Sequence, residues 1–119
     1  MIRQRVPLTE EPISGAEAVE DYDRYARRYM LPVYRYFVRK ILNRGIRKGR
    51  VLDIGTGPGY LAIEVAKARN SDFTITALDM SAAMIEKAKE ISRREGTSSQ
   101  INFVVGNAST LPFPKKSFD

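Results

Sequence analysis

The sequence predicts a protein of the α/β class: a Rossmann-like parallel sheet with helices on both faces, preceded by N-terminal helices. Two apolar runs, Val51–Ile54 and Phe73–Leu78, have the length and composition of buried strands. A glycine-rich turn and a helical pattern lie between them, and a third apolar run follows at 102–105. Strands that alternate with helices pair in parallel, because each helix carries the chain back across the sheet.

The turn after the first strand is the most informative segment of the chain. Glycines at alternate positions, Gly55, Gly57 and Gly59, let the backbone turn sharply and approach a ligand that a Cβ atom would exclude. The helix that begins at Tyr60 then directs its free amide groups at the same place. The pattern favours a nucleotide-cofactor site, although any tight strand-to-helix turn also selects glycine.

The second strand ends in an acid, Asp79, which is followed by Met80 and Ser81. In a Rossmann-like unit the second parallel strand lies beside the first, so its C-terminal carboxylate faces the same crevice as the glycine turn. There the carboxylate can accept hydrogen bonds from two ribose hydroxyls. Asp79 can also serve as the acid at a helix N-terminus, and we expect Ser81 to cap that helix.

The kind of cofactor follows from the details of the turn. Dinucleotide sites space their glycines as G-x-G-x-x-G, whereas here the glycines fall on every second residue. Asp53 lies two residues before the first glycine, and its charge would repel a pyrophosphate but suits a ligand that carries an ammonium group. We therefore expect S-adenosylmethionine, with an NAD(P)-binding oxidoreductase domain as an alternative.

Three runs, VLDIGTGPGYLAIEVAK, ALDMSAAMIEKAKE and NFVVGNASTLPFPKKSFD, resemble the class I S-adenosylmethionine-dependent methyltransferases. The resemblance points in particular to the type 11 group, which includes the ubiquinone/menaquinone-biosynthesis enzymes, and it covers about residues 50 to 119 in order. It implies methyl transfer to a small-molecule acceptor. It also implies that one set of residues lies under the methionyl part of the cofactor: Asp53, Gly55, Thr56, Gly57 and Gly59.

For the adenosine part, the resemblance implies Asp79 at the ribose hydroxyls and Met80 against one face of the adenine. Relatives carry Gly-Asp-Ala after the third strand, with the acid accepting from the adenine amino group, and this chain has Gly-Asn-Ala at 106–108. The amide oxygen of Asn107, with Ala108 beside it, can accept the same hydrogen bond without a charge. Two further residues would either flank the adenine edge or serve as plain packing: Leu111 and Pro112.

The resemblance also sets an expectation for where the sheet stops. In the family, Ser117-Phe118-Asp119 begins or immediately precedes a fourth strand in the middle of a seven-stranded sheet. Residues 50–119 would then be the cofactor-binding half of the domain, without the C-terminal half. The first strand would be an exposed sheet edge, which favours a homo-oligomer through that edge. We assign no catalytic residue, and a non-catalytic fragment or binding module is an alternative.

The N-terminal part is expected to form a loose arm at residues 1–15 and a helical segment at residues 16–49. A helix is predicted from Ala16 to Met30, with an interruption at Pro32, and a second helix from Pro32 to Arg44 should dock on the sheet. The apolar face of the second helix consists of Val33, Tyr34, Phe37, Val38, Ile41 and Leu42. The resemblance implies that the segment covers the cofactor crevice. Its tyrosines would then line the pocket, unless they form a core or an interface: Tyr22, Tyr25 and Tyr29.

Charge and composition narrow the function further. The net charge is +6, and ten basic residues against the single acid Asp23 lie between Tyr22 and Arg50. Such a stretch could meet RNA, an anionic lipid surface or an acidic substrate, or be a solvated face. An RNA or protein methyltransferase is thus an alternative, but nucleic-acid binding is not favoured because no recognised motif accompanies the charge.

Residue types that are absent also exclude some chemistry. The chain has no cysteine and no histidine, so we expect no disulfide, no metal site and no histidine base. No run of about 18 apolar residues is present, and Met1-Ile2-Arg3-Gln4-Arg5 is followed by no signal-type stretch. We therefore expect a cytoplasmic protein without membrane insertion.

Overall fold

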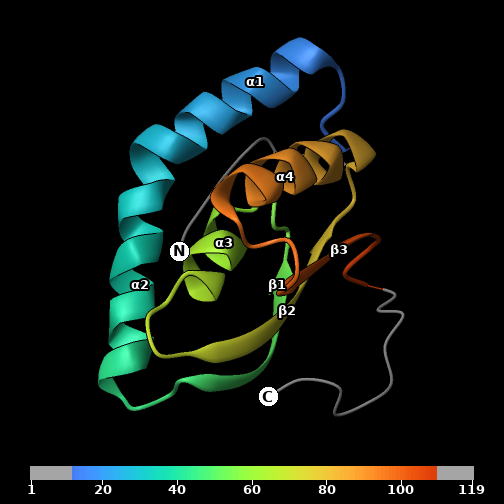
Figure 1. Cartoon of the computed structure of the whole chain (residues 1–119). Helices are drawn as coiled ribbons and strands as arrows, with labels where there is room; N and C mark the ends of the chain where they lie inside the picture. Colours follow the sequence, from blue (N-terminus) through green and yellow to red (C-terminus); the bar gives the residue numbers. More distant parts are fainter. Residues whose placement is uncertain (1–11, 110–119) are drawn as a thin grey trace.

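The computed structural model describes residues 12–109 as three strands with helices packed against them (Figure 1). Leu111, Pro112 and residues 117–119, for which the sequence analysis made predictions, lie outside these residues, as does most of the predicted arm. The elements in chain order are α1 (Ala16–Tyr25), the π-helical segment η1 (Ala26–Met30), α2 (Leu31–Asn43), β1 (Lys48–Ile54), α3 (Tyr60–Ala66), β2 (Asp72–Asp79), α4 (Ala82–Glu95) and β3 (Ile101–Val105).

The sheet is parallel, as the sequence predicts, with the strand order β1-β2-β3. β2 is the central strand, and its residues Ile75, Ala77 and Leu78 are fully buried. β1 pairs with β2 on one side only within the described residues, so it forms an edge and is half-buried, where the sequence suggested a buried strand. Asp53 is opposite Ala77 and Ala77 is opposite Phe103 in the register.

One face of the sheet carries the hydrophobic core. Phe73, Ile75 and Ala77 alternate along β2 and pack in one cluster with side chains of α3 and α4, whereas Thr74 on the opposite face is exposed. Successive right-handed crossovers in the same direction place both connecting helices on one side of a sheet, which accounts for this arrangement. The described helices cover this face, and helices on the other face stay a prediction.

The start of α4 follows the predicted capping rule. Ser81 has extended backbone angles, and its Oγ accepts a hydrogen bond from the backbone N–H of Met84 at 3.0 Å. This bond satisfies one of the free amides of the first turn, which stabilises a helix by about 1 kcal/mol. The Oγ of Ser81 also donates to the carbonyl of Ile13, so the end of the predicted loose arm is tied to the start of α4.

The predicted interruption at Pro32 is wrong: the helical chain runs on from Ala16 to Asn43 and curves along its length (Figure 1). The five residues before α2 form a π-helical turn, and Pro32 lies in the first turn of α2. Proline lacks only an N–H that an α-helix does not need in its first turn, and the wide turn before it absorbs the mismatch. The chain therefore keeps its direction where a break was predicted.

The apolar face of α2 packs differently from the prediction. Val38 is buried, and Tyr34, Ile41 and Leu42 pack against the same core, but Phe37 is 52% exposed and Val33 is also exposed. The helix rests chiefly on α3, because α3 and α4 already occupy the sheet face. In residues 12–109 no helix combines the length and apolarity needed to cross a bilayer.

Candidate functional site

The carboxyl ends of β1 and β2 bring two acids to one edge of the sheet. Side chains on a strand alternate between faces, so Asp79, two residues after Ala77, lies on the same face as Asp53, which is opposite Ala77. Burial raises the pKa of Asp53 to about 6, and the nearby charge of Asp79 adds to this, while a 2.8 Å hydrogen bond from the Thr56 hydroxyl opposes it. The predicted pair of acids thus lies on one face at the same edge of the sheet.

Asp79 ties the two loops of the crevice together. Its Oδ2 accepts a hydrogen bond from the backbone N–H of Gly57 at 2.9 Å, and its Oδ1 accepts one from the backbone N–H of Ser81 at 2.9 Å. Each oxygen keeps a second lone pair for a ligand. Asp79 therefore contacts both the start of α4 and the glycine turn, and its contact with ribose stays a prediction.

The three glycines of the turn have different surroundings. All have positive φ: +73° at Gly55, +54° at Gly57 and +85° at Gly59. A Cβ at Gly55 would meet open space, whereas a Cβ at Gly59 would lie 3.0 Å from the Cβ of Ala88 and 3.2 Å from the ring of Phe103. Gly59 therefore serves the packing of α3 on α4 and β3, and Gly55 leaves room in the crevice.

The other predicted site residues lie at the same edge but are less engaged. The backbone N–H of Gly106 donates to the Asp79 carbonyl at 2.9 Å, which places the turn after β3 beside Asp79. Met80, Asn107 and Ala108 are exposed there. The Oδ1 of Asn107 already accepts hydrogen bonds from the N–H and hydroxyl of Ser109, at 2.9 and 2.8 Å, so the predicted acceptor is occupied within its own turn.

A buried carboxylate beside the site was missed by the sequence prediction. Asp23 is only 4% exposed, and its Oδ1 accepts a 2.6 Å hydrogen bond from the hydroxyl of Tyr60, the first residue of α3. Its Oδ2 pairs with Arg27 at 3.2 Å. The one available signal was an acid four residues before an arginine inside a basic stretch.

The tyrosines of the N-terminal helix divide into two groups. An edge atom of the Tyr22 ring lies 3.4 Å from the position that a Gly57 Cβ would occupy, so this ring covers the glycine turn. The rings of Tyr25 and Tyr29 contact each other in a tilted arrangement, with centroids 5.4 Å apart and planes at 46°, and both side chains are exposed. Of the three candidates for the pocket, Tyr22 is the one that reaches the turn.

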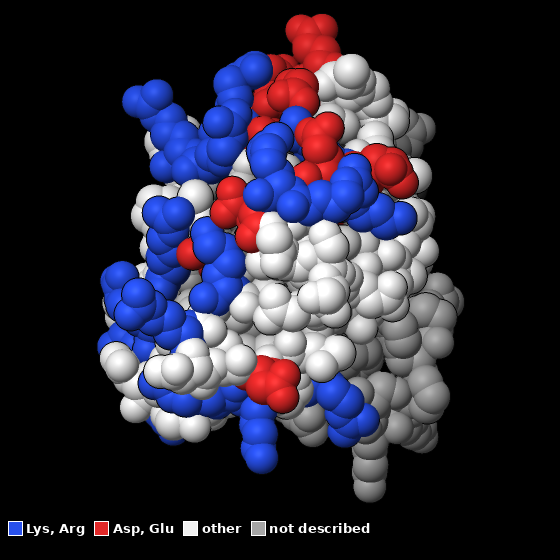
Figure 2. All heavy atoms as spheres, viewed as in Figure 1, with Lys and Arg blue, Asp and Glu red and all other residues white. Residues whose placement is uncertain are grey.

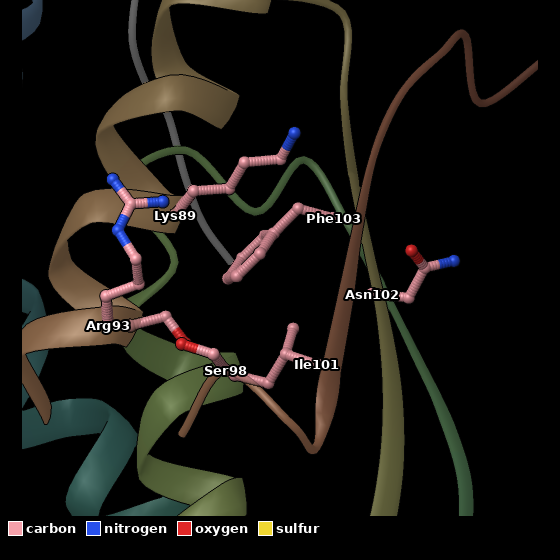
Figure 3. Close-up of a pocket in the computed structure, with 7 residues that line it drawn as sticks. Lys89, Arg93, Ser98, Ile101, Asn102 and Phe103 are labelled. Atoms are coloured by element: carbon pink, nitrogen blue, oxygen red, sulfur yellow. The ribbon is translucent and has the colours of Figure 1, made fainter. Parts of the chain in front are cut away.

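A separate pocket of about 290 Å³ lies between α4 and β3 (Figure 3). Lys89 and Arg93 project from α4, and Ile101 and Phe103 come from β3. None of the predicted cofactor residues lines it. Within residues 12–109, no group of three or more acidic side chains lies close enough together to hold a metal ion.

Comparison with known proteins identifies the family of the chain. Residues 51–119 match the methyltransferase domain family. The chain is 31% identical to the ubiquinone/menaquinone biosynthesis C-methyltransferase of Geotalea daltonii, over 94% of this chain and 50% of that protein. It is 38% identical to the cycloartenol-C-24-methyltransferase of Arabidopsis thaliana, over 66% of this chain and 23% of that protein.

A solved structure extends the similarity to three dimensions. The crystal structure of a candidate S-adenosyl-L-methionine-dependent methyltransferase from Methanococcus maripaludis superposes with a TM-score of 0.74 and 32% identity, over 89% of this chain and 48% of that one. The chain thus spans about half the length of that protein and at most half of the two curated relatives. The match over residues 51–119, more than half of the chain, shows that it belongs to the class I S-adenosylmethionine-dependent methyltransferases.

Proposed function

We propose that this chain binds S-adenosylmethionine, the cofactor of its family, in the crevice at the carboxyl ends of β1 and β2. The observation that carries the proposal is the position of Asp79, whose carboxylate holds the N–H of Gly57 and the N–H of Ser81 at once. A carboxylate fixed between the two loops is well placed for a pair of ribose hydroxyls. We further propose that the whole protein transfers the methyl group to a small-molecule acceptor.

The two acids divide the recognition of the cofactor between them. Asp79 would hold the ribose, and Asp53 would face the ammonium of the methionyl part, for which its raised pKa is a physical argument. Burial and the charge of Asp79 make an ionised Asp53 unfavourable, so a cation placed between the two acids would relieve both costs. This charge balance favours a cationic ligand over a pyrophosphate.

The remaining predicted residues would contribute contacts without charge. The open space beside Gly55 gives room for the methionyl chain, and the exposed side chain of Met80 is free to cover the adenine. Asn107 would have to release Ser109 before its oxygen could accept from the adenine amino group, so we expect a weaker role for it. The packing of Gly59 against Ala88 indicates a structural task instead of a direct contact.

The bound cofactor supplies a methyl group that is already activated by its sulfonium. The protein then has to align the acceptor and exclude water, and such positioning can be worth about 7–11 kcal/mol. In the described residues the crevice contains no histidine or cysteine, and we assign no general base. The names of the relatives, a quinone-biosynthesis and a sterol methyltransferase, support a small organic acceptor.

The alternatives carry less support. Membership of a methyltransferase family argues against an NAD(P)-binding oxidoreductase. Lys and Arg side chains gather along the side formed by η1 and α2 (Figure 2), which is the one feature in favour of an RNA or protein substrate. A binding module without catalysis also stays open to test. A cytoplasmic location stays a prediction from the sequence.

Calorimetric titration with S-adenosylhomocysteine, S-adenosylmethionine and NADH tests the cofactor. We expect both adenosyl ligands to bind and NADH to fail. Asp79→Ala should weaken S-adenosylhomocysteine binding about 100-fold or more, because two hydrogen bonds to a charged group, each worth about 1.5–3 kcal/mol, are lost. Asp72→Ala, which removes an exposed acid at the other end of β2, should leave the affinity unchanged. Binding that survives Asp79→Ala would remove this residue from the site.

A further inference from the structure

The N-terminal helix is tied to both loops that form the cofactor crevice. At its start, the carbonyl of Ile13 accepts a hydrogen bond from the Oγ of Ser81, in the loop after β2. Farther along, Glu20 pairs with Lys87 of α4 at 2.6 Å. Near its end, Asp23 accepts the 2.6 Å hydrogen bond from Tyr60, in the first turn after the glycine loop. α1 therefore spans the distance between the two loops.

The third of these ties is the buried one. The Glu20–Lys87 pair is half exposed on the glutamate side and adds little, as surface ion pairs do. The carboxylate of Asp23 is almost fully enclosed, and a buried charge is tolerated only with partners, which Tyr60 and Arg27 supply. Burial, with the adjacent carboxylate, raises the pKa of the Tyr60 hydroxyl, so Tyr60 stays protonated as the donor.

The residue next to Asp23 covers the site. The Tyr22 ring lies against Gly57, and the N–H of Gly57 is the donor that holds Asp79. Any movement of α1 away from α3 would therefore uncover the turn on which the ribose acid depends. A Cβ at position 57 would lie in ordinary van der Waals contact with this ring, 3.4 Å from its nearest atom, so the positive φ of Gly57 is what favours glycine there.

We propose that the Asp23–Tyr60 hydrogen bond is a latch that holds α1, and with it Tyr22, over the glycine turn. Asp23 and Tyr60 are then positioning residues for the cofactor, acting through Tyr22. This rests on the proposed function for the identity of the ligand. The latch slows the release of the cofactor and keeps water from the glycine turn. A chain without the latch retains Asp53 and Asp79, but its α1 lies over the glycine turn for a smaller fraction of the time.

The first test follows the covering ring without any ligand. The chain contains no tryptophan, so Tyr22→Trp introduces a single indole at the covering position. Acrylamide should quench its fluorescence weakly when the latch is intact and several-fold more strongly when Tyr60→Phe removes the hydroxyl. Tyr36→Phe, the same chemical change at an exposed ring of α2, should not alter the quenching. Equal quenching in all three chains would overturn the latch.

The second test follows the release of S-adenosylhomocysteine by stopped-flow dilution. Tyr60→Phe should raise the dissociation rate about tenfold or more, as expected for the loss of a hydrogen bond to a charged group, and Asp23→Ala should do the same. In the double variant the effects should not add, because either change opens the same latch. Asp23→Asn keeps an acceptor for Tyr60 and should restore much of the slow release. Additive effects, or no change in the rate, would contradict the proposal.

The two tests separate the latch from the proposed function. If the unchanged chain fails to bind S-adenosylhomocysteine, the proposed function fails, and the quenching experiment still decides whether the latch exists. If the chain binds the ligand but the variants release it at the original rate, the latch alone fails. Circular dichroism checks that each variant folds, and if Tyr60→Phe does not fold, quenching and release are compared between Asp23→Ala and the unchanged chain.

Discussion

Asp53 and Asp79 are neighbours with opposite surroundings. Asp79 accepts hydrogen bonds from two backbone N–H groups. Asp53 has the single hydroxyl of Thr56 in support, and burial raises its pKa from 3.8 to about 6. Near neutral pH the site therefore lacks a positive charge to balance Asp53. We expect pH to act on both the stability of the chain and the binding of the ligand through the ionisation of Asp53.

The first prediction concerns stability. Because the folded chain binds the Asp53 proton more tightly than the unfolded chain, this group's contribution is greatest below about pH 4. It falls as the pH rises to about 6, by up to roughly 1.4 kcal/mol per pH unit. Asp53→Asn should abolish the fall and be more stable than the unchanged chain at pH 7. Urea unfolding followed by circular dichroism from pH 4 to 7 measures this, and Asp72→Asn serves as the exposed control. Parallel curves for Asp53→Asn and the unchanged chain would be evidence against the raised pKa.

The second prediction concerns binding at the same residue. A ligand with an ammonium group prefers ionised Asp53, so the affinity for S-adenosylhomocysteine should rise as the pH increases from about 5 and level off above about 6. The affinity of the Asp53→Asn chain should be lower and should not change over this range. Calorimetry at several pH values, each in two buffers of different ionisation enthalpy, would also reveal the released proton. A flat profile in the unchanged chain would place the ammonium elsewhere.

At the scale of elements, the β1–α3 turn combines two tasks that mutations can separate. Gly55→Ala and Gly59→Ala both place a Cβ at positive φ, which costs about 1–2 kcal/mol. Only the second also pushes against Ala88 and Phe103, for a further 1–3 kcal/mol or so. Gly59→Ala should therefore be the less stable variant, and Gly55→Ala should lose more affinity for the cofactor. Urea unfolding and calorimetry on the two variants check this; the reverse order would mean that the crevice lies on the Gly59 side.

Local rules predicted those elements whose signals lie close together in sequence. The cap at Ser81 and the glycine turn follow from residues a few positions apart, and the parallel strands follow from the alternation of strands with helices; the structure has all three. The prediction of an interruption at Pro32 was wrong because the effect of a proline depends on whether it lies in the first turn of a helix. The π-helical turn at Ala26–Met30 places the first turn of α2 at Pro32. No pattern within one helix reveals such a shift.

The site was predictable only in part, for the same reason. Asp53, Asp79 and the glycines come together because parallel strands end at one edge, which a sequence can indicate. The contact of Asp23 with Tyr60 joins residues 37 positions apart and depends on how α1 lies across α3. Asn107 shows the opposite case, since a polar residue in the expected place has its acceptor occupied by Ser109.

At the scale of the molecule, the free side of β1 is the feature most open to association. Within the described residues one side of this strand has no partner, and Ile54 at its end is exposed. An unpaired edge of this kind favours pairing with another chain. The sequence predicted a homo-oligomer through this edge, and the prediction stands to be tested.

A charge on the edge should prevent that pairing. Leu52→Lys places a lysine on β1, on the face away from the helices, and should shift the chain toward the monomer in sedimentation velocity over a wide range of concentrations. Thr74→Lys adds the same charge to the same face of β2, which is paired on both sides, and should leave the association unchanged. An unchanged chain that stays monomeric throughout would rule out the edge as an interface.

The π-helical turn at Ala26–Met30 fixes the angular phase between the two helices that it joins. Each residue of an α-helix advances the spiral by about 100°, so deleting one residue from this wide turn would swing everything before it around the axis by about that angle. The side chains of Tyr22 and Asp23 would then point away from α3, while the position of α2 would not change. The extra residue of the π-helical turn therefore sets the rotation of α1 about the helix axis. A change of one residue in the length of this turn decides whether Tyr22 lies over the glycine turn.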